Sequence, residues 1–135
     1  MSIEIKYPTS TERSRYNLND LRTIDDQVDI ILKCVYDHAS QRSVIFSSFN
    51  PSVCTAINWK QPNYGVFFGT RCGFGRKGGM LGTEELPAPD GDRRCGSIKE
   101  AVRFAKNSNF LGVVCEATPL VSLCDTLTFQ CCKSI

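Results

Sequence analysis

The sequence lacks the features that mark several common classes of protein. It has a single histidine and a single tryptophan, and none of its eight cysteines forms a C-x-x-C pair. One histidine excludes a catalytic histidine pair and a two-histidine metal site built from this chain alone. Its longest hydrophobic runs, such as 44–46, fall far short of the ~18–20 residues that cross a bilayer. We therefore predict no membrane span.

A strong charge of one sign is also missing. The 135 residues carry 16 Lys and Arg against 14 Asp and Glu, for a formal net charge of +2. A chain this close to neutrality gives no reason to expect a nucleic-acid partner. The start, MSIEIKYP, lacks the basic and apolar regions of a secretory signal. We expect a cytoplasmic protein with reduced thiols; a secreted, disulfide-rich protein is the alternative.

Hydrophobic spacing predicts alternating strands and helices. Strands are expected at 2–7, 43–49, 64–68 and 111–115, and helices at 24–39, 50–59 and 97–107. Residues 9–19 are expected to be a polar loop and 69–96 a long loop holding eight of the ten glycines. The pattern indicates a parallel sheet covered by helices, as in a doubly wound sheet or part of a (β/α)8 barrel. Polar residues near strand ends favour the barrel.

The first strand carries the sharpest local feature. Alternation places Glu4 and Lys6 on one face, about 6–7 Å apart. A carboxylate and an ammonium at a barrel mouth suit a divalent cation and an anionic oxygen; a solvated face or a simple ion pair is the alternative. At the end of the next strand, Ser47 and Phe49 would contact substrate at a barrel rim. Helix capping by Ser48 or Asn50 would also account for the polar residues there.

Two further motifs favour ordinary interpretations. Gly73, Gly75 and Gly78 spell G-x-G-x-x-G, but no helix signal follows directly, as a dinucleotide site requires. A surface loop is the better interpretation, with a basic, anion-binding loop second. His38 stands near the end of a predicted helix. A surface or capping role is favoured over a general base, because no cysteine or serine nearby forms an evident pair with it.

Three segments together resemble a known family: SIEIKYP, DIILKCVYDHASQRSVIFSSFNPSVCTAINWKQPNYGVFFGT and SIKEAVRFAKNSNFLGVV. They are similar to the glycerophosphodiester phosphodiesterase domain, most closely its eukaryotic cytosolic branch. The similarity covers roughly 3–70 and 97–121; the glycine-rich loop and the last fifteen residues fit poorly. It implies an α/β fold, a partial (β/α)8 barrel of about strands four to seven. The domain would occupy 1–121, with 69–96 as a loop insertion and 122–135 as a divergent tail.

The resemblance also implies a chemistry. The family hydrolyses glycerophosphodiesters, such as glycerophosphocholine, to an alcohol and glycerol 3-phosphate with a divalent cation, Mg²⁺ or Ca²⁺. Carried over to this sequence, Glu4 is a metal ligand and Lys6 contacts the phosphate. Ser47 and Phe49 lie near the substrate. A hard cation prefers carboxylate oxygens, and a phosphodiester needs fixed positive charge, so the residue types agree with these roles.

The resemblance further implies that this chain is incomplete as a catalyst. The family's catalytic histidines and most of its metal ligands come from strands that precede the E-I-K strand. No catalytic residue is therefore assigned here, and the chain alone is expected to be inactive. The alternative function is a non-catalytic half-barrel that binds a phosphate ligand or a protein partner. Open strand edges suggest self-association or a second chain that completes the barrel.

Overall fold

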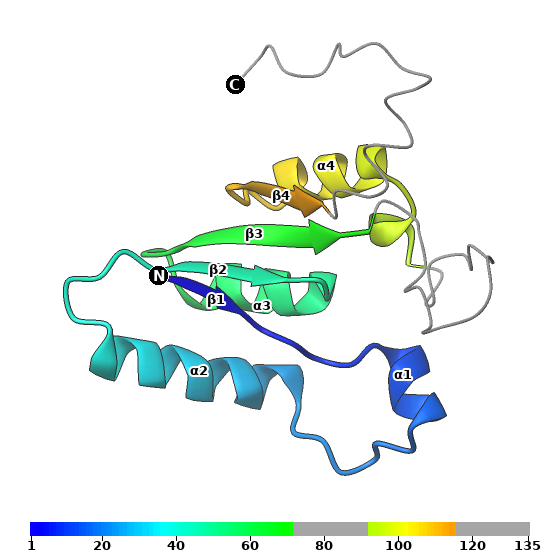
Figure 1. The fold of residues 1–135 in the computed structure, drawn as a ribbon, viewed down its shortest axis with the longest axis horizontal. Helices are drawn as coiled ribbons and strands as arrows, with labels where there is room; N and C mark the ends of the chain where they lie inside the picture. Colours follow the sequence, from blue (N-terminus) through cyan, green and yellow to red (C-terminus); the bar gives the residue numbers. More distant parts are fainter. Residues whose placement is uncertain (72–91, 116–135) are drawn as a thin grey trace, which may run out of the picture.

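One parallel sheet organises the computed structural model, which describes residues 1–71 and 92–115 (Figure 1). Its strands lie in the order β1-β2-β3-β4. They are β1 (Ser2–Glu4), β2 (Ile45–Ser48), β3 (Gly65–Thr70) and β4 (Gly112–Cys115). Consecutive order without a reversal is compatible with part of a barrel and lacks the switch point of a doubly wound sheet. The predicted α/β class is confirmed.

Helices connect consecutive strands and cover one face of the sheet (Figure 1). They are α2 (Ile24–His38), α3 (Pro51–Lys60) and α4 (Ile98–Asn107), with a short 3-10 turn, η1 (Arg93–Cys95), before α4. Each α-helix starts at a polar cap: the side chains of Thr23, Asn50 and Ser97 accept hydrogen bonds from backbone N–H groups of the first turn. These three helices begin within one residue of the predicted positions.

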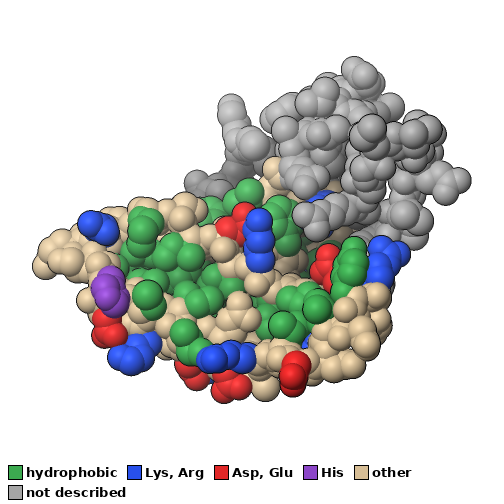
Figure 2. Space-filling view, turned by 60° about the horizontal axis from the view of Figure 1, so that its bottom comes forward, with side chains coloured by type: hydrophobic (Ala, Val, Ile, Leu, Met, Phe, Trp, Pro, Cys, Tyr) green, Lys and Arg blue, Asp and Glu red, His purple; other side chains and the backbone are tan. Residues whose placement is uncertain are grey.

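The core lies between this face and the helices. Val28, Leu32 and Val35 recur at helical spacing along α2 and are buried. They pack in one cluster with Phe46 and Phe68 of the strands. The Phe104 ring of α4 meets Phe68 edge-on, with the ring centroids 5.2 Å apart. Figure 2 shows hydrophobic side chains across the middle of one side of the molecule, with charged side chains mostly around them.

The opposite face of the sheet is not covered by a described helix. Parallel register places Glu4, Ser47, Phe67 and Gly112 in one row across the four strands. Ser47 and Phe67 alternate with the buried Ser48 and Phe68, so the row faces away from the helices. We call this surface the open face. Its exposed apolar residues include Ile45 (39% exposed) and Val114 (46% exposed).

Two loop predictions are wrong in part. Residues 9–19 contain a helix, α1 (Ser10–Arg15), because Thr9 and Glu12 form a reciprocal capping box at its start. The predicted loop 69–96 begins too early, since Gly69 and Thr70 continue β3 and pair with Val114 and Cys115. Residues 72–91, with the G-x-G-x-x-G motif, and the tail 122–135 lie outside the described residues. No described helix is long and apolar enough to cross a membrane.

Candidate functional site

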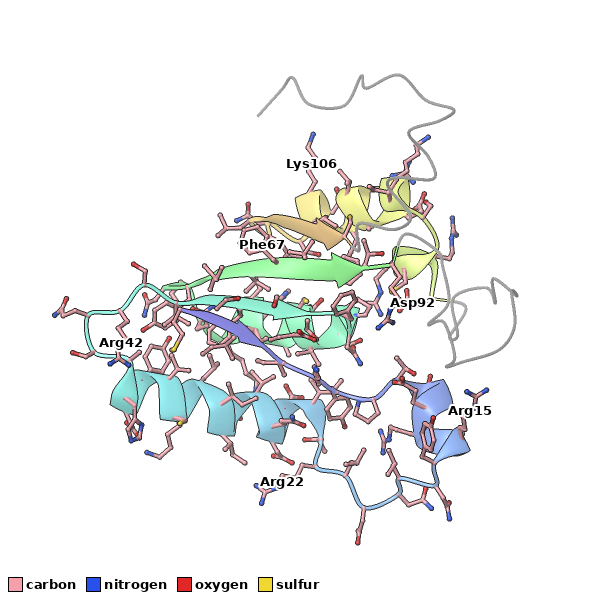
Figure 3. All side chains as sticks on the ribbon, in the orientation of Figure 1. Arg15, Arg22, Arg42, Phe67, Asp92 and Lys106 are labelled. Atoms are coloured by element: carbon pink, nitrogen blue, oxygen red, sulfur yellow. The ribbon has the colours of Figure 1, made fainter. Side chains whose placement is uncertain are left out.

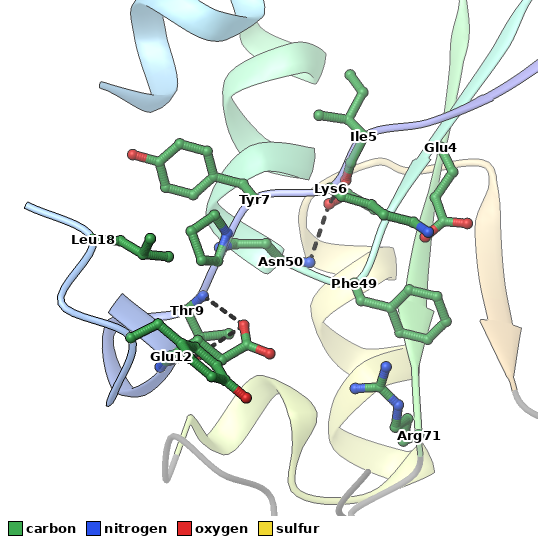
Figure 4. Close-up of a pocket in the computed structure, with 13 residues that line it drawn as sticks. Glu4, Ile5, Lys6, Tyr7, Thr9, Glu12, Leu18, Phe49, Asn50 and Arg71 are labelled. Atoms are coloured by element: carbon green, nitrogen blue, oxygen red, sulfur yellow. Dashed lines mark hydrogen bonds between the residues drawn. The ribbon is translucent and has the colours of Figure 1, made fainter. Parts of the chain in front are cut away.

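A cavity of about 540 Å³ opens at the carboxyl ends of β1, β2 and β3 (Figure 4). This volume suits a small-molecule ligand. The carboxyl edge of a parallel sheet is where such folds bind ligands, because the loops that follow the strands converge there. Residues that the sequence predicted for substrate and metal, Glu4, Lys6 and Phe49, line the cavity. The structure therefore brings these three together.

Glu4 is the last residue of β1, and Lys6 lies two residues beyond it. Ile5 between them is buried, and its N–H donates to the Ser47 carbonyl at 2.8 Å. Burial of Ile5 turns both charged side chains to the other face, where they extend side by side (Figure 4). Both are exposed to solvent. Among the described residues, no ion pair of 4 Å or less joins them, so the simple ion pair that we considered is absent.

Ser48 ties the ends of β1 and β2 together beneath the cavity. Its buried hydroxyl donates to the Ile5 carbonyl at 2.7 Å and accepts from the Asn50 N–H at 3.1 Å. Asn50 in turn caps α3 through its side-chain oxygen, which accepts from Ser52 N–H at 3.0 Å. The capping interpretation of this segment is thus confirmed for Asn50. Phe49, held between these two anchored residues, points into the cavity (Figure 4).

Arg71 and Phe49 stack on each other and form another side of the cavity. The Arg71 guanidinium lies over the Phe49 ring, 5.0 Å from its centroid. The same ring lies across Gly69, where an added Cβ would stand 3.0 Å from ring carbons. A side chain at this position would require the ring to shift by a few tenths of an ångström. Gly69 therefore allows the ring to approach β3 closely, and it lies in the strand and not in a loop.

The helix α1 supplies the wall on the β1 side. Thr9, Glu12, Tyr16 and Leu18 line the cavity there. The Glu12 carboxylate accepts from the Thr9 N–H at 3.0 Å and from its hydroxyl at 3.2 Å, which fixes the start of the helix (Figure 4). The cavity therefore carries two carboxylates, Glu4 and Glu12, and two cations, Lys6 and Arg71.

Two candidates lie elsewhere. Ser47 shares the row of Glu4 on the open face, but it is not among the residues that line the cavity. His38 is exposed at the last residue of α2, with Nδ1 at 2.9 Å from the Cys34 carbonyl. As the last residue of α2, it lies at the end of the helix that leads into the amino end of β2, whereas Asp92 lies near the carboxyl end of the sheet (Figure 1 and Figure 3). It is too remote to act on a ligand in the cavity.

The donor set does not form a complete metal site. Within residues 1–71 and 92–115, no group of three or more His, Cys, Asp and Glu is placed to hold a metal ion. Mg²⁺ and Ca²⁺ usually take six or more oxygen ligands, including waters. Glu4 offers one carboxylate, so these residues do not by themselves fit either ion.

Three groups with shifted pKa values, Asp92, Arg94 and Cys54, lie outside the cavity. Asp92 and Arg94 pair at 2.7 Å, and the hydrogen bonds from the Arg94 guanidinium lower the pKa of Asp92. Arg94 also stacks on Phe104, 5.2 Å from the ring centroid. Burial raises the pKa of the Cys54 thiol to about 12. None of these four lines the cavity, so they belong to the packing of α3, η1 and α4.

Three parts of the cavity were missed by sequence reasoning. Arg71 was considered only as part of a basic loop, because the end of β3 was placed at Phe68. The wall formed by α1 was missed although Thr9 and Glu12 have the T-x-x-E spacing of a capping box. The hydroxyl of Ser48 gave no signal for its bond to Ile5, since that bond joins residues 43 positions apart.

Comparison with known proteins identifies relatives of this segment. No family model matches the chain, and no solved structure matches it. The ankyrin repeat protein nuc-2 of Neurospora crassa is 34% identical over 148 residues, covering 85% of this chain and 14% of that protein. Glycerophosphocholine phosphodiesterase GDE1 of Candida albicans is 35% identical over 122 residues, covering 89% of this chain and 9% of its own length.

A human protein gives the same result. Glycerophosphocholine phosphodiesterase GPCPD1 of Homo sapiens is 31% identical over 115 residues, which cover 83% of this chain and 16% of that protein. This chain therefore spans only a small part of each relative. The matches nevertheless cover most of its own length. The resemblance seen in the sequence is confirmed: the chain is homologous to a segment of the glycerophosphocholine phosphodiesterases.

Proposed function

We propose that this chain forms the phosphate-binding side of a glycerophosphodiester site. The observation that carries the proposal is the convergence of Glu4, Lys6 and Phe49 on one cavity at the carboxyl edge of a parallel sheet. The three relatives described above each match more than four fifths of this chain, and two of them are named as glycerophosphocholine phosphodiesterases. A glycerophosphodiester such as glycerophosphocholine is the ligand class that we assign to the cavity.

Each residue has a role in the proposal. The Lys6 ammonium pairs with a phosphate oxygen, an interaction in which charge-assisted hydrogen bonds are strong. The Glu4 carboxylate provides one of several ligands to Mg²⁺ or Ca²⁺, the others coming from outside the described residues. Phe49 forms the apolar floor against the substrate. Ser47, beside Glu4 in the same row but outside the lining of the cavity, contacts the substrate only at the margin of the site.

Hydrolysis by this chain alone is expected to be undetectable. The described residues bring no histidine to the cavity, and His38 lies at the far end of the sheet. A phosphodiester needs a positioned proton donor for its leaving alcohol. Release of glycerol 3-phosphate from glycerophosphocholine, measured with Mg²⁺ or Ca²⁺, should stay at background. Turnover that disappears in Glu4→Ala would overturn this part of the proposal.

Binding is the decisive test of the proposed site. Calorimetric titration of glycerophosphocholine into the purified chain with Mg²⁺ should give measurable affinity. Lys6→Met should weaken it about 10-fold, the loss of one charge-assisted hydrogen bond. Lys106→Met is the matched control, because Lys106 is exposed at the end of α4 away from the cavity. Equal affinity of native chain and Lys6→Met would contradict the proposal.

A second candidate function rests on the open face. Ile45, Leu111 and Val114 are exposed on or beside this face, and β1 is an edge strand whose only partner among the described residues is β2. A second copy of the chain against this face would bring eight parallel strands together, the number in a (β/α)8 barrel. The assembly would be non-catalytic and could still bind a phosphate ligand at the cavity of each copy.

Light scattering during size-exclusion chromatography tests this candidate. The native chain should run as a dimer, and Ile45→Lys should shift it to a monomer by placing a charge in the interface. Val102→Lys is the matched control, since Val102 is similarly exposed but lies on α4. A monomeric native chain at high concentration would rule out self-association and leave the phosphate-binding proposal untouched.

A further inference from the structure

The cavity is lined by a second cationic side chain, which the motif of Glu4 and Lys6 does not predict. Arg71 follows β3, two residues after Gly69, and lines the same cavity as Lys6. Lys6 follows β1 at the other side of Phe49, which follows β2. The view in Figure 4 shows the Phe49 ring between the two cations. The segments that follow three neighbouring strands thus bring a lysine, an aromatic ring and an arginine to the same cavity.

The contact with Phe49 orders the guanidinium. Arginine stacked on an aromatic face within about 6 Å of its centroid gains a cation–π attraction, and Arg71 lies at 5.0 Å. A guanidinium carries its N–H donors as a rigid fork in one plane. That fork matches two oxygens of a phosphate group, a geometry that lysine does not offer.

The ring is itself fixed by the backbone. An added Cβ at Gly69 would stand within 3.0–3.2 Å of the Phe49 ring carbons, so the ring lies directly against β3. The neighbours of Phe49, Ser48 and Asn50, are held by hydrogen bonds to β1 and to α3. Gly69, Phe49 and Arg71 therefore form one positioned unit in which each member restricts the next.

We propose that Arg71, held by Phe49, is a second phosphate-binding residue of the cavity in addition to Lys6. The inference rests on the proposed function and adds a residue to it. Two cations that approach from different strands hold a singly charged phosphodiester more firmly than Lys6 alone. They also offset the nearby carboxylates of Glu4 and Glu12, which would otherwise repel the anion. Phe49 is a positioning residue for Arg71 as well as a surface for the ligand.

Titration with glycerol 3-phosphate in the presence of Mg²⁺ tests the inference on the full chain. Arg71→Met should bind it about 10-fold more weakly than the native chain. Arg71→Lys keeps the charge but loses the fork, so its affinity should fall between the two. Arg42→Met is the matched control and should bind like the native chain, because Arg42 is exposed at the opposite end of the sheet (Figure 3).

A double-mutant cycle then tests the positioning role of Phe49. Phe49→Leu should weaken binding by itself and add less when Arg71 is already Met, because the part of its contribution that acts through Arg71 is then already lost. Additive losses would overturn that role. Thermal unfolding of every variant confirms that each is folded, and Arg71→Lys provides a variant with unchanged charge.

The outcomes separate this inference from the proposed function. If Arg71→Met binds within about twofold of the native chain while Lys6→Met loses binding, Arg71 is not a phosphate ligand and the proposed function stands. If Arg71→Met loses binding and Lys6→Met does not, the phosphate site exists without the role assigned to Lys6. Absence of binding by the native chain would overturn both.

Discussion

The two faces of the sheet differ in burial and in the kinds of residue that they present. The face under the helices is built from side chains with almost no exposure, such as Phe46 and Phe68. The open face carries charged, small and half-buried residues in the same strands, with Glu4, Ser47 and Phe67 in one row. Adjacent residues in one strand therefore have different roles, one in stability and the other in contact with a ligand. The covered face holds the chain together, and the open face presents the groups that would meet a ligand.

Adjacent phenylalanines of β3 give the largest expected contrast. Phe68 is fully buried against Phe104, so Phe68→Ala should lower the free energy of unfolding by about 3–5 kcal/mol. Phe67→Ala, on the open face, should cost less than half as much. Urea unfolding of both variants measures the difference. Equal losses would show that the open face is as well packed as the covered one.

Thiol reactivity compares the core with the surface. The pKa of Cys54 is raised from 9.0 to about 12 by burial. Its thiolate fraction at pH 8 is therefore roughly a thousandfold below that of an unperturbed thiol. Iodoacetamide should label the exposed Cys34 quickly and Cys54 only on unfolding. Peptide mapping after timed labelling gives both rates, and similar rates would contradict a closed core around α3.

Adjacent serines of β2 test the link between the core and the cavity. Ser48→Ala removes a buried hydroxyl that bonds Ile5 and Asn50, at an expected cost of about 1–3 kcal/mol. It should also weaken glycerol 3-phosphate binding, because the end of β1 that carries Lys6 loses an anchor. Ser47→Ala should change stability by less than about 0.5 kcal/mol. A larger loss of stability in Ser47→Ala than in Ser48→Ala would contradict the assignment of Ser48 to the covered face and Ser47 to the open face.

The smallest expected effect concerns acid stability. The pKa of Asp92 lies below its usual 3.8 because of Arg94, so the pair stabilises the fold above pH 3.8 and this contribution is lost as pH falls further. The stability difference between native chain and Arg94→Met should therefore shrink between pH 5 and pH 3. Arg42→Met, which removes an exposed arginine that has no carboxylate partner among the described residues, should show no such trend. A difference that is constant with pH would contradict the pairing.

The sequence predicted the covered face better than the open one. Periodic apolar residues such as Val28, Leu32 and Val35 announce a buried helix face, because burial imposes the spacing locally. The alternation along the first strand likewise predicted that the side chains of Glu4 and Lys6 lie on the same face. Arg71 was not predictable, because its place depends on where β3 ends and on the Phe49 ring across the sheet. Gly69 looked like a loop residue, since glycine that makes room for a neighbour resembles glycine that makes a turn.

Of the proposed roles, metal binding is the one that the sequence predicts least completely. Glu4 is the only carboxylate that the family resemblance assigns, and residue types alone could not reveal how many further ligands accompany it. The described residues do not supply a cluster around it. Ligand sets of hard cations draw on strands distant in sequence. Neither periodicity nor local motifs within this chain could therefore predict a complete set.

The most direct test of the central claim is an NMR titration of the isotope-labelled chain with glycerol 3-phosphate. It shows which backbone amides the ligand perturbs. We expect the largest NMR shift changes at Lys6, Phe49 and Arg71, which border the cavity at the carboxyl edge of the sheet. The amides of His38 and Arg42, at the amino edge, should not move. Changes confined to that amino edge, or spread evenly over the chain, would contradict a phosphate site on the open face.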